Sequence, residues 1–169
     1  MKCPNIFRIA ALLSLGALAC AVPALAQEYQ SGHGALQIWD EAAQSAAPQW
    51  VQVWLIILIG SFALGLLFVW KRVIARWVVG GFIAMIGTMI ILTGPLGLPS
   101  LSGMIALVHI IFWSPALYLL LTRRPFLKER SFYGAWSALI TAVILFSFVF
   151  DVRDTAIYLD HILGTGLFA

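Results

Sequence analysis

One histidine, His109, lies within the apolar run of residues 101–121 and is the side chain best placed to do chemistry. It is the only side chain in any of the long apolar runs that titrates near neutral pH. If the run forms a membrane-spanning helix, His109 lies roughly 12 Å from its start, close to mid-bilayer. Trp113 follows one turn later, and Ser114–Pro115 then frees a backbone carbonyl near Ile111. Together these groups predict a polar notch in an otherwise apolar helix.

Three interpretations of this notch remain open. The one we favour is a packing role, in which a neutral His109 hydrogen-bonds a carbonyl or a hydroxyl group. The second is an axial ligand to haem b, with Met85 of a neighbouring helix, or His109 of a second copy, as the other ligand. The third is a quinone that receives a hydrogen bond from His109 and stacks on Trp113. Packing is preferred because methionine commonly fills gaps, and membrane b-type cytochromes carry paired histidines.

Four polar side chains near the C-terminus share one helical face, within an arc of roughly 80° at 100° per residue. They are Asp151, Asp154, Tyr158 and His161. Asp151, Asp154 and His161 together could hold a divalent cation, helped by His33 or Glu41, but their spacing matches no established ligand motif. A solvated acidic face is the simpler interpretation. Between the two functional readings, a docking surface for another protein ranks above a metal site.

The composition places these residues in a membrane protein. Of 169 residues, 62% are hydrophobic and only 10% charged, and the mean hydropathy is +0.99. So little polar surface cannot coat a soluble globule. The formal charge of +3 comes from bases near the ends of apolar runs, which indicates membrane topology rather than nucleic-acid binding.

Residues 1–26 are predicted to be a cleaved signal peptide. Lys2 and Arg8 form its basic start, residues 9–21 are too short to span a bilayer comfortably, and residues 24–26 have the small-x-small form of a cleavage site. An uncleaved anchor, adding a fifth span, is the alternative. Either form places the next segment outside the cytoplasm.

Both cysteines, Cys3 and Cys20, lie in this leader. A lipoprotein signal at Cys20 is a weaker alternative, because the residues before it fit a lipobox poorly. After cleavage the mature chain has no thiol, which excludes disulfides, thiolate catalysis and cysteine-ligated metals.

The rest of the chain is predicted to form an all-α membrane domain. Residues 27–50 form an outer segment with a short interfacial helix from Leu36 to Trp50. Four spans follow, at residues 51–70, 77–93, 101–121 and 132–150, with Ser100 as the N-cap of the third. The tail, residues 151–169, continues the last helix as far as Leu163, and Gly164 ends it.

Charge segregation predicts the orientation. The inner loops hold seven bases (Lys71, Arg72, Arg76, Arg123, Arg124, Lys128 and Arg130) against one acid, Glu129. The outer segments hold six acids (Glu28, Asp40, Glu41, Asp151, Asp154 and Asp160) against one base, Arg153. The positive-inside rule then gives an antiparallel four-helix bundle in a bacterial inner membrane, with the N-terminus and the tail in the periplasm.

Small residues predict where these helices touch, because they let two backbones approach. The expected contacts are at Ser61, Gly65, Gly80, Ala84, Gly87, Gly103 and Ala106. Ser137 and Thr141 on the last span are expected to hydrogen-bond carbonyls of their own helix.

The sequence contains no hydrolase, metalloprotease, nucleotide-binding or dinucleotide-binding motif, and its residues reproduce no family motif. We therefore expect no catalytic activity of the isolated chain. The favoured function is an accessory or interaction subunit of a larger membrane complex. The alternative is a haem- or quinone-binding redox module centred on His109. Expected partners are the lipid bilayer and other membrane proteins or further copies of this chain, without nucleic acid.

Overall fold

The computed structural model describes residues 34–167, and the predicted signal peptide lies outside these residues. Within them the chain is helical, apart from one isolated antiparallel bridge between Ile38 and Leu101. The helices are α2 (Glu41–Ala46), α3 (Gln49–Gly65), α4 (Val73–Thr93), α5 (Ser102–Arg123), α6 (Pro125–Lys128) and α7 (Phe132–Leu163). The predicted all-helical fold is confirmed for this part of the chain.

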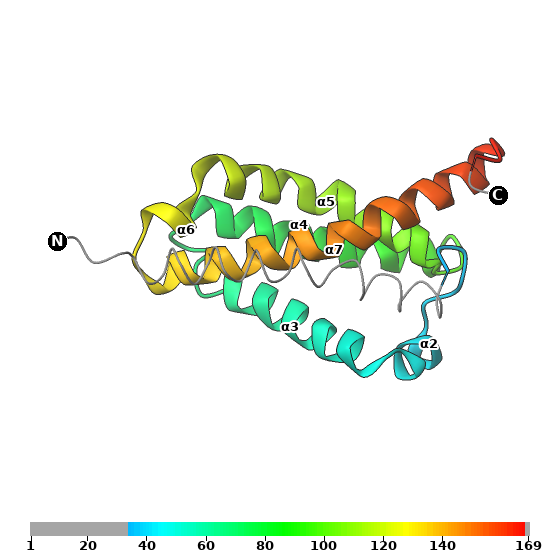
Figure 1. Cartoon of the computed structure of the whole chain (residues 1–169), viewed down its shortest axis with the longest axis horizontal. Helices are drawn as coiled ribbons and strands as arrows, with labels where there is room; N and C mark the ends of the chain where they lie inside the picture. The colour runs from blue at the N-terminus through cyan, green and yellow to red at the C-terminus, as the bar shows by residue number, and fades with distance from the viewer. Residues whose placement is uncertain (1–33, 168–169) are drawn as a thin grey trace.

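The four longest helices lie side by side (Figure 1). α5 packs most extensively on α7 and then on α4, and α3 completes the arrangement by contacting both α4 and α7. Trp113, Trp136 and Phe62 are the largest fully buried side chains, and they lie in the core that these helices enclose. Burial of such large side chains fixes the lateral order of the helices.

Three of the helical segments are long and apolar enough to cross a membrane: α4, the α5–α6 segment Ser102–Lys128, and α7. α3 is apolar but has only 17 residues. After Gly65 the chain continues in turns, in which Leu66 N lies 3.0 Å from Ala63 O. The predicted span 51–70 is therefore not one continuous helix.

Close contacts hold the last residue of α3 and the turns that follow it. A Cβ atom on Gly65 would lie 2.9 Å from both Val79 and Trp136, so this residue lies directly against α4 and α7. Beyond it, Arg76 donates to the carbonyl oxygens of Val69 at 2.7 Å and Trp70 at 3.0 Å. These bonds replace the ones that a longer helix would supply.

α7 is continuous from Phe132 to Leu163, as predicted. Ser131 caps its start by accepting a hydrogen bond from Gly134 N at 3.2 Å. Gly164 ends it in the left-handed conformation, with φ 64°. The 32 residues span roughly 48 Å at 1.5 Å per residue.

The outer segment differs from the prediction of a helix over residues 36–50. Only Glu41–Ala46 is helical, with Asp40 as N-cap, and Pro48 separates it from α3 because proline lacks a backbone N–H. Before Asp40 the backbone instead pairs with the start of α5, where Trp39 N donates to Ser100 O at 2.8 Å. The predicted N-cap at Ser100 is also wrong, since its hydroxyl donates to Trp39 O at 3.3 Å.

The small-residue predictions are correct in part. A Cβ on Gly103 would meet Tyr158 Cβ at 2.5 Å, so α5 and α7 touch there as expected. The contacts expected at Gly80 and Gly87 are wrong, because a Cβ at either would have nothing within 4 Å. The close approach on α4 is at Gly81, one residue further round the helix, whose Cβ would lie 2.5 Å from Phe112 O.

Both hydroxyls of the last span bond to their own helix, as predicted. Ser137 Oγ donates to Gly134 O at 2.7 Å, and Thr141 Oγ1 donates to Ser137 O at 2.6 Å. These hydroxyls are thereby satisfied within α7 and do not reach His109.

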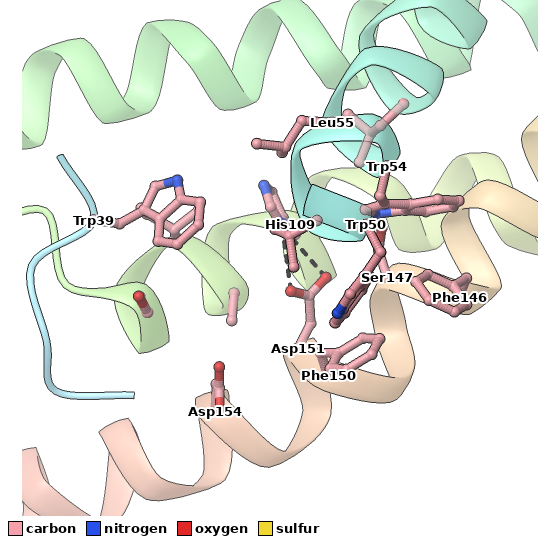
Figure 2. Close-up of a pocket in the computed structure, with 15 residues that line it drawn as sticks. Trp39, Trp50, Trp54, Leu55, His109, Phe146, Ser147, Phe150, Asp151 and Asp154 are labelled. Carbon is pink, nitrogen blue, oxygen red and sulfur yellow. Dashed lines mark hydrogen bonds and ion pairs between the residues drawn. The ribbon is translucent and has the colours of Figure 1, made fainter. Parts of the chain in front are cut away.

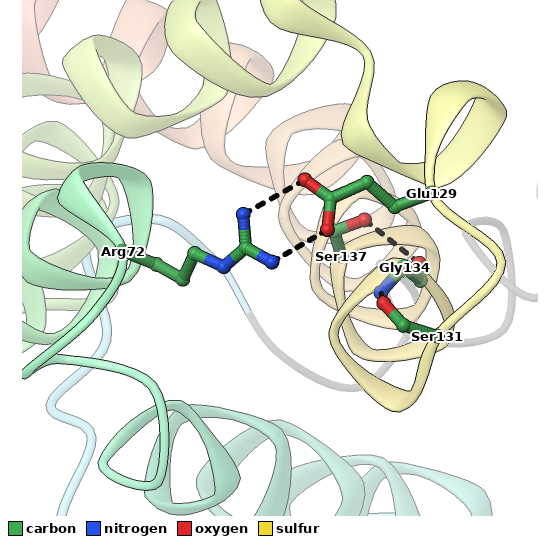
Figure 3. Close-up of polar contacts among 5 residues, drawn as sticks. All are labelled: Arg72, Glu129, Ser131, Gly134 and Ser137. Atoms are coloured by element: carbon green, nitrogen blue, oxygen red, sulfur yellow. Dashed lines mark hydrogen bonds and ion pairs between the residues drawn. The ribbon is translucent and has the colours of Figure 1, made fainter.

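An ion pair joins the two basic loops at one end of the molecule. Arg72, after α3, donates to Glu129, before α7, through both terminal nitrogens at 2.9 and 2.7 Å (Figure 3). The guanidinium also lies 4.4 Å from the centroid of the Tyr133 ring. The segment before α2, the α4–α5 loop and the C-terminal end of α7 lie at the other end (Figure 1).

Candidate functional site

His109 of α5 faces Asp151 of α7. Its Nδ1 lies 3.3 Å from each carboxylate oxygen, and the two side chains are 19% and 12% exposed (Figure 2). The expected partner, a carbonyl or a hydroxyl, is thus replaced by a carboxylate. The physical reason is the height at which α7 packs on α5, which brings Asp151 level with His109.

The imidazole ring is held on two sides. It stacks on Trp113 with 4.1 Å between ring centroids and 10° between planes. Because Nδ1 faces Asp151, the Nε2 edge points the other way, and Figure 2 shows a ring nitrogen directed away from the carboxylate. A histidine whose one nitrogen is bound to a carboxylate presents the other in a fixed orientation, as in metal-ligand and general-base histidines.

The proline notch next to His109 is partly filled from within α5. Ser114 Oγ donates to Ile110 O at 2.5 Å, one residue before the carbonyl expected to be freed by Pro115. The Ser114 hydroxyl is therefore occupied within α5.

His109 lines a cavity of about 130 Å³ between α3, α5 and α7 (Figure 2). The lining residues are Trp39, Trp50, Val51, Trp54, Leu55, Leu58, Ser102, Ile105, Ala106, His109, Phe146, Ser147, Phe150, Asp151 and Asp154. On the α3–α7 side, Trp54 contacts Phe146 at 4.4 Å and Trp50 contacts Phe150 at 6.2 Å between ring centroids. The cavity thus has aromatic and aliphatic walls with a polar group at His109.

The polar lining combines hydrogen-bond acceptors with the indole N–H groups of Trp39, Trp50 and Trp54, which can only donate. Asp151 and Asp154 supply two buried carboxylates, and no lysine or arginine is among the lining residues. Arg153 reaches Asp154 at 3.4 Å, and its side chain is 44% exposed. Ser147 Oγ is buried and has no hydrogen-bond partner among residues 34–167. A ligand in this cavity would find one unpartnered hydroxyl and several oxygen or nitrogen lone pairs.

The other residues predicted around His109 are not in the cavity. Trp113 is 1% exposed and stacks on His109 itself, so it is not available to stack on a ligand there. Met85 is buried in the hydrophobic core and is also absent from the lining. This arrangement gives no support to the His109–Met85 axial pair.

The four tail residues do not form one solvent-facing surface, which corrects that interpretation. Asp151 and Asp154 are buried, Tyr158 packs at Gly103, and only His161 is exposed. The cause is that the first turns of the tail run along α5 instead of standing clear of the bundle. Within residues 34–167 no group of three His, Cys, Asp or Glu side chains could hold a metal ion, so the predicted metal site at Asp151, Asp154 and His161 finds no support.

Sequence reasoning missed the aromatic wall. Trp50 and Trp54 on α3, and Phe146 and Phe150 on α7, are each four residues apart, which places each pair on one helical face. This spacing could have predicted an aromatic face on each helix. It could not have predicted that the faces of α3 and α7 contact each other.

Searches against protein-family models, curated proteins and solved structures each find no match for this chain.

Proposed function

We propose that this chain is a small integral membrane protein that binds a single-ring ligand of the quinone class in the cavity between α3, α5 and α7. The observation that carries the proposal is the His109–Asp151 pair at the wall of an aromatic-lined cavity. Such a cavity takes a flat apolar ring, while a fixed imidazole edge gives the ring one oriented hydrogen bond.

The size of the cavity favours a quinone head group over haem. An apolar cavity of about 150 Å³ accommodates benzene, and the cavity here, at about 130 Å³, is slightly smaller, so it can enclose one six-membered ring at most. A haem macrocycle is several times larger than one six-membered ring. Its second axial ligand would also have to come from outside the cavity, because His109 is the only histidine or methionine in the lining.

The membrane placement belongs to the same proposal. α3 would cross together with the turns that follow it, which makes four crossings, and the basic loops joined by Arg72 and Glu129 would face the cytoplasm of a bacterial cell. The cavity then opens toward the periplasmic side. α3 alone covers roughly 26 Å at 1.5 Å per residue, against a hydrocarbon core of roughly 30 Å.

A cavity-filling variant tests the binding proposal. The full chain, purified and placed in nanodiscs, is titrated with 2-methyl-1,4-benzoquinone while tryptophan fluorescence is followed. Ala106→Leu narrows the cavity and should weaken binding at least about tenfold, the effect of losing the space for one or two methyl groups of ligand. Ala135→Leu adds the same side chain to an exposed position of α7 and should bind like the wild type. Absence of saturable binding of both the quinone and its hydroquinone by the wild type, or equal binding by Ala106→Leu, would reject the proposal.

The second candidate function is an accessory subunit, and the end of α7 favours it. Four apolar side chains are exposed there, beyond the buried carboxylates: Leu159, Ile162, Leu163 and Leu167. Exposed apolar groups at a helix end are a common mark of protein contacts. The double change Ile162→Ser and Leu163→Ser should release a stoichiometric partner or dissociate a homo-oligomer, whereas His161→Ala should not. Unchanged assembly size for the double variant would remove this candidate.

A further inference from the structure

We infer that the cavity selects the reduced, hydroxyl-bearing form of its ring ligand over the oxidised, carbonyl form. This inference rests on the proposed function, since it names which form of the quinone class the site takes. It depends on the direction in which the polar groups of the cavity can donate hydrogen bonds.

The first step concerns the tautomer of His109. A carboxylate accepts hydrogen bonds, so Asp151 calls for a proton on Nδ1, which lies 3.3 Å from both of its oxygens. A neutral imidazole with its proton on Nδ1 has a bare lone pair on Nε2. Nε2 is then an acceptor, and its partner must be a donor. The stack on Trp113 holds the ring in the plane that maintains this arrangement.

The second step concerns the other polar groups that face the cavity. Asp154 adds a second carboxylate, and the lining tryptophans Trp39, Trp50 and Trp54 bring indole N–H groups that can only donate. The nearest guanidinium, that of Arg153, is bound to Asp154 rather than lining the cavity. Ser147 can donate one hydrogen bond, but it can equally accept one. The lining therefore holds both donors and acceptors, and the preferred form of the ligand is decided at the oxygen that meets His109 Nε2, which this tautomer makes an acceptor.

The third step compares the two forms of the ligand. A hydroxyl group donates to Nε2 and forms one good hydrogen bond. A carbonyl oxygen at the same place brings two lone pairs against another lone pair, and both groups lose hydration without compensation. Sites built to pair a hydroxyl reject the analogue that lacks it much more strongly than apolar pockets reject an extra group.

The test uses two probes of nearly equal shape, 2-methylhydroquinone and 2-methyl-1,4-benzoquinone, and a bulkier one without hydroxyl donors, the dimethyl ether of the hydroquinone. Binding to the full chain in nanodiscs is measured by calorimetry under argon. The hydroquinone should bind about tenfold tighter than the quinone and than the ether, the value of one hydrogen bond. Equal or tighter binding of the quinone would overturn the inference and leave the proposed function in place. Failure of all three probes to bind would overturn the proposed function itself.

Two variants assign the preference to the His109–Asp151 pair. Asp151→Asn offers an amide N–H to Nδ1 and so permits the proton to move to Nε2, which should reduce the tenfold preference to below about threefold. His109→Phe keeps an aromatic ring beside Trp113 but removes both nitrogens, and it should bind the hydroquinone no better than the quinone. His161→Phe, at an exposed position of the same helix as Asp151, should keep the wild-type preference. Circular dichroism and gel filtration verify folding, and a full preference in folded Asp151→Asn would overturn the inference.

Discussion

Gly103 of α5 lies directly against Tyr158 of α7, where a Cβ on the glycine would come within 2.5 Å of the tyrosine Cβ. Asp154 O and Ala35 O lie at 2.7 and 3.1 Å from the same point. This contact keeps the end of α7 against the first turn of α5. Because Asp151 lies less than two turns back along α7, the contact also helps to place the carboxylate beside His109.

Gly103→Ala should therefore lower the stability of the protein. Three neighbours, two of them backbone oxygens, would have to move, and overpacking of this kind costs about 1–3 kcal/mol. The measurement is thermal unfolding in detergent, followed by circular dichroism. Gly87→Ala is the matched control, since its new Cβ would have nothing within 4 Å, and it should be neutral or slightly stabilising. Equal effects of the two changes would contradict the close contact.

A double-mutant cycle should show that His109 and Asp151 stabilise each other. Each side chain is mostly buried, so removing one leaves the other without its partner, and the coupling energy between His109→Ala and Asp151→Ala should be about 1–3 kcal/mol. Unfolding by a denaturing detergent provides the free energies. The cycle between His161→Ala and Asp151→Ala should be additive within about 0.5 kcal/mol, because His161 is exposed. A coupling near zero for the first cycle would mean that the pair is not formed.

Arg72→Lys should lower the free energy of unfolding by a small but measurable amount. The change keeps the charge and loses the two-pronged bond to Glu129 and the planar contact with Tyr133. With side chains 41% and 32% exposed, the pair is screened by solvent, and a loss of about 0.5–1 kcal/mol is expected. Arg130→Lys, at an exposed position of the same end, should leave the unfolding temperature unchanged. Identical unfolding temperatures for both variants would show that the ion pair adds nothing.

The orientation can be tested by cysteine labelling in intact cells. After Cys3 and Cys20 are changed to serine, Leu96→Cys should react with a reagent that cannot cross the membrane, and Lys128→Cys should not. Leu96 is 60% exposed and lies in the α4–α5 loop, beside Gly97, whose φ of 62° makes that glycine a poor position for substitution. Labelling at Lys128 and not at Leu96 would reverse the proposed orientation.

Much of the helical architecture follows from patterns that the sequence displays locally. The long run without glycine or proline from Ala135 to Leu163, and the glycine after it, predict the end of α7 correctly because nothing in between can stop a helix. The hydroxyls of Ser137 and Thr141 bond as predicted for the same local reason. The early end of α3 was not predictable from hydropathy, because the turns after Gly65 are as apolar as the helix before them.

The candidate site was predictable only in its parts. His109 stood out because an imidazole is rare in an apolar run. Asp151 was predicted to lie on the tail, away from His109. The periodicity of one helix does not determine the height at which a second helix packs against it. That height is set by long-range contacts such as Gly103 with Tyr158. The pairing between α5 and α7 is a tertiary contact. Because of it, Asp151 and Asp154, which were expected on a solvated face, line a cavity instead.

The pairing of His109 with Asp151 also bears on how the chain is assembled. α5 precedes α7 in the chain, so the imidazole is synthesised before the carboxylate that pairs with it. α5 then carries an unpaired polar group until the last helix docks. A polypeptide truncated before Asp151 would remain in that incomplete state, in which cellular proteases could distinguish it from the finished product.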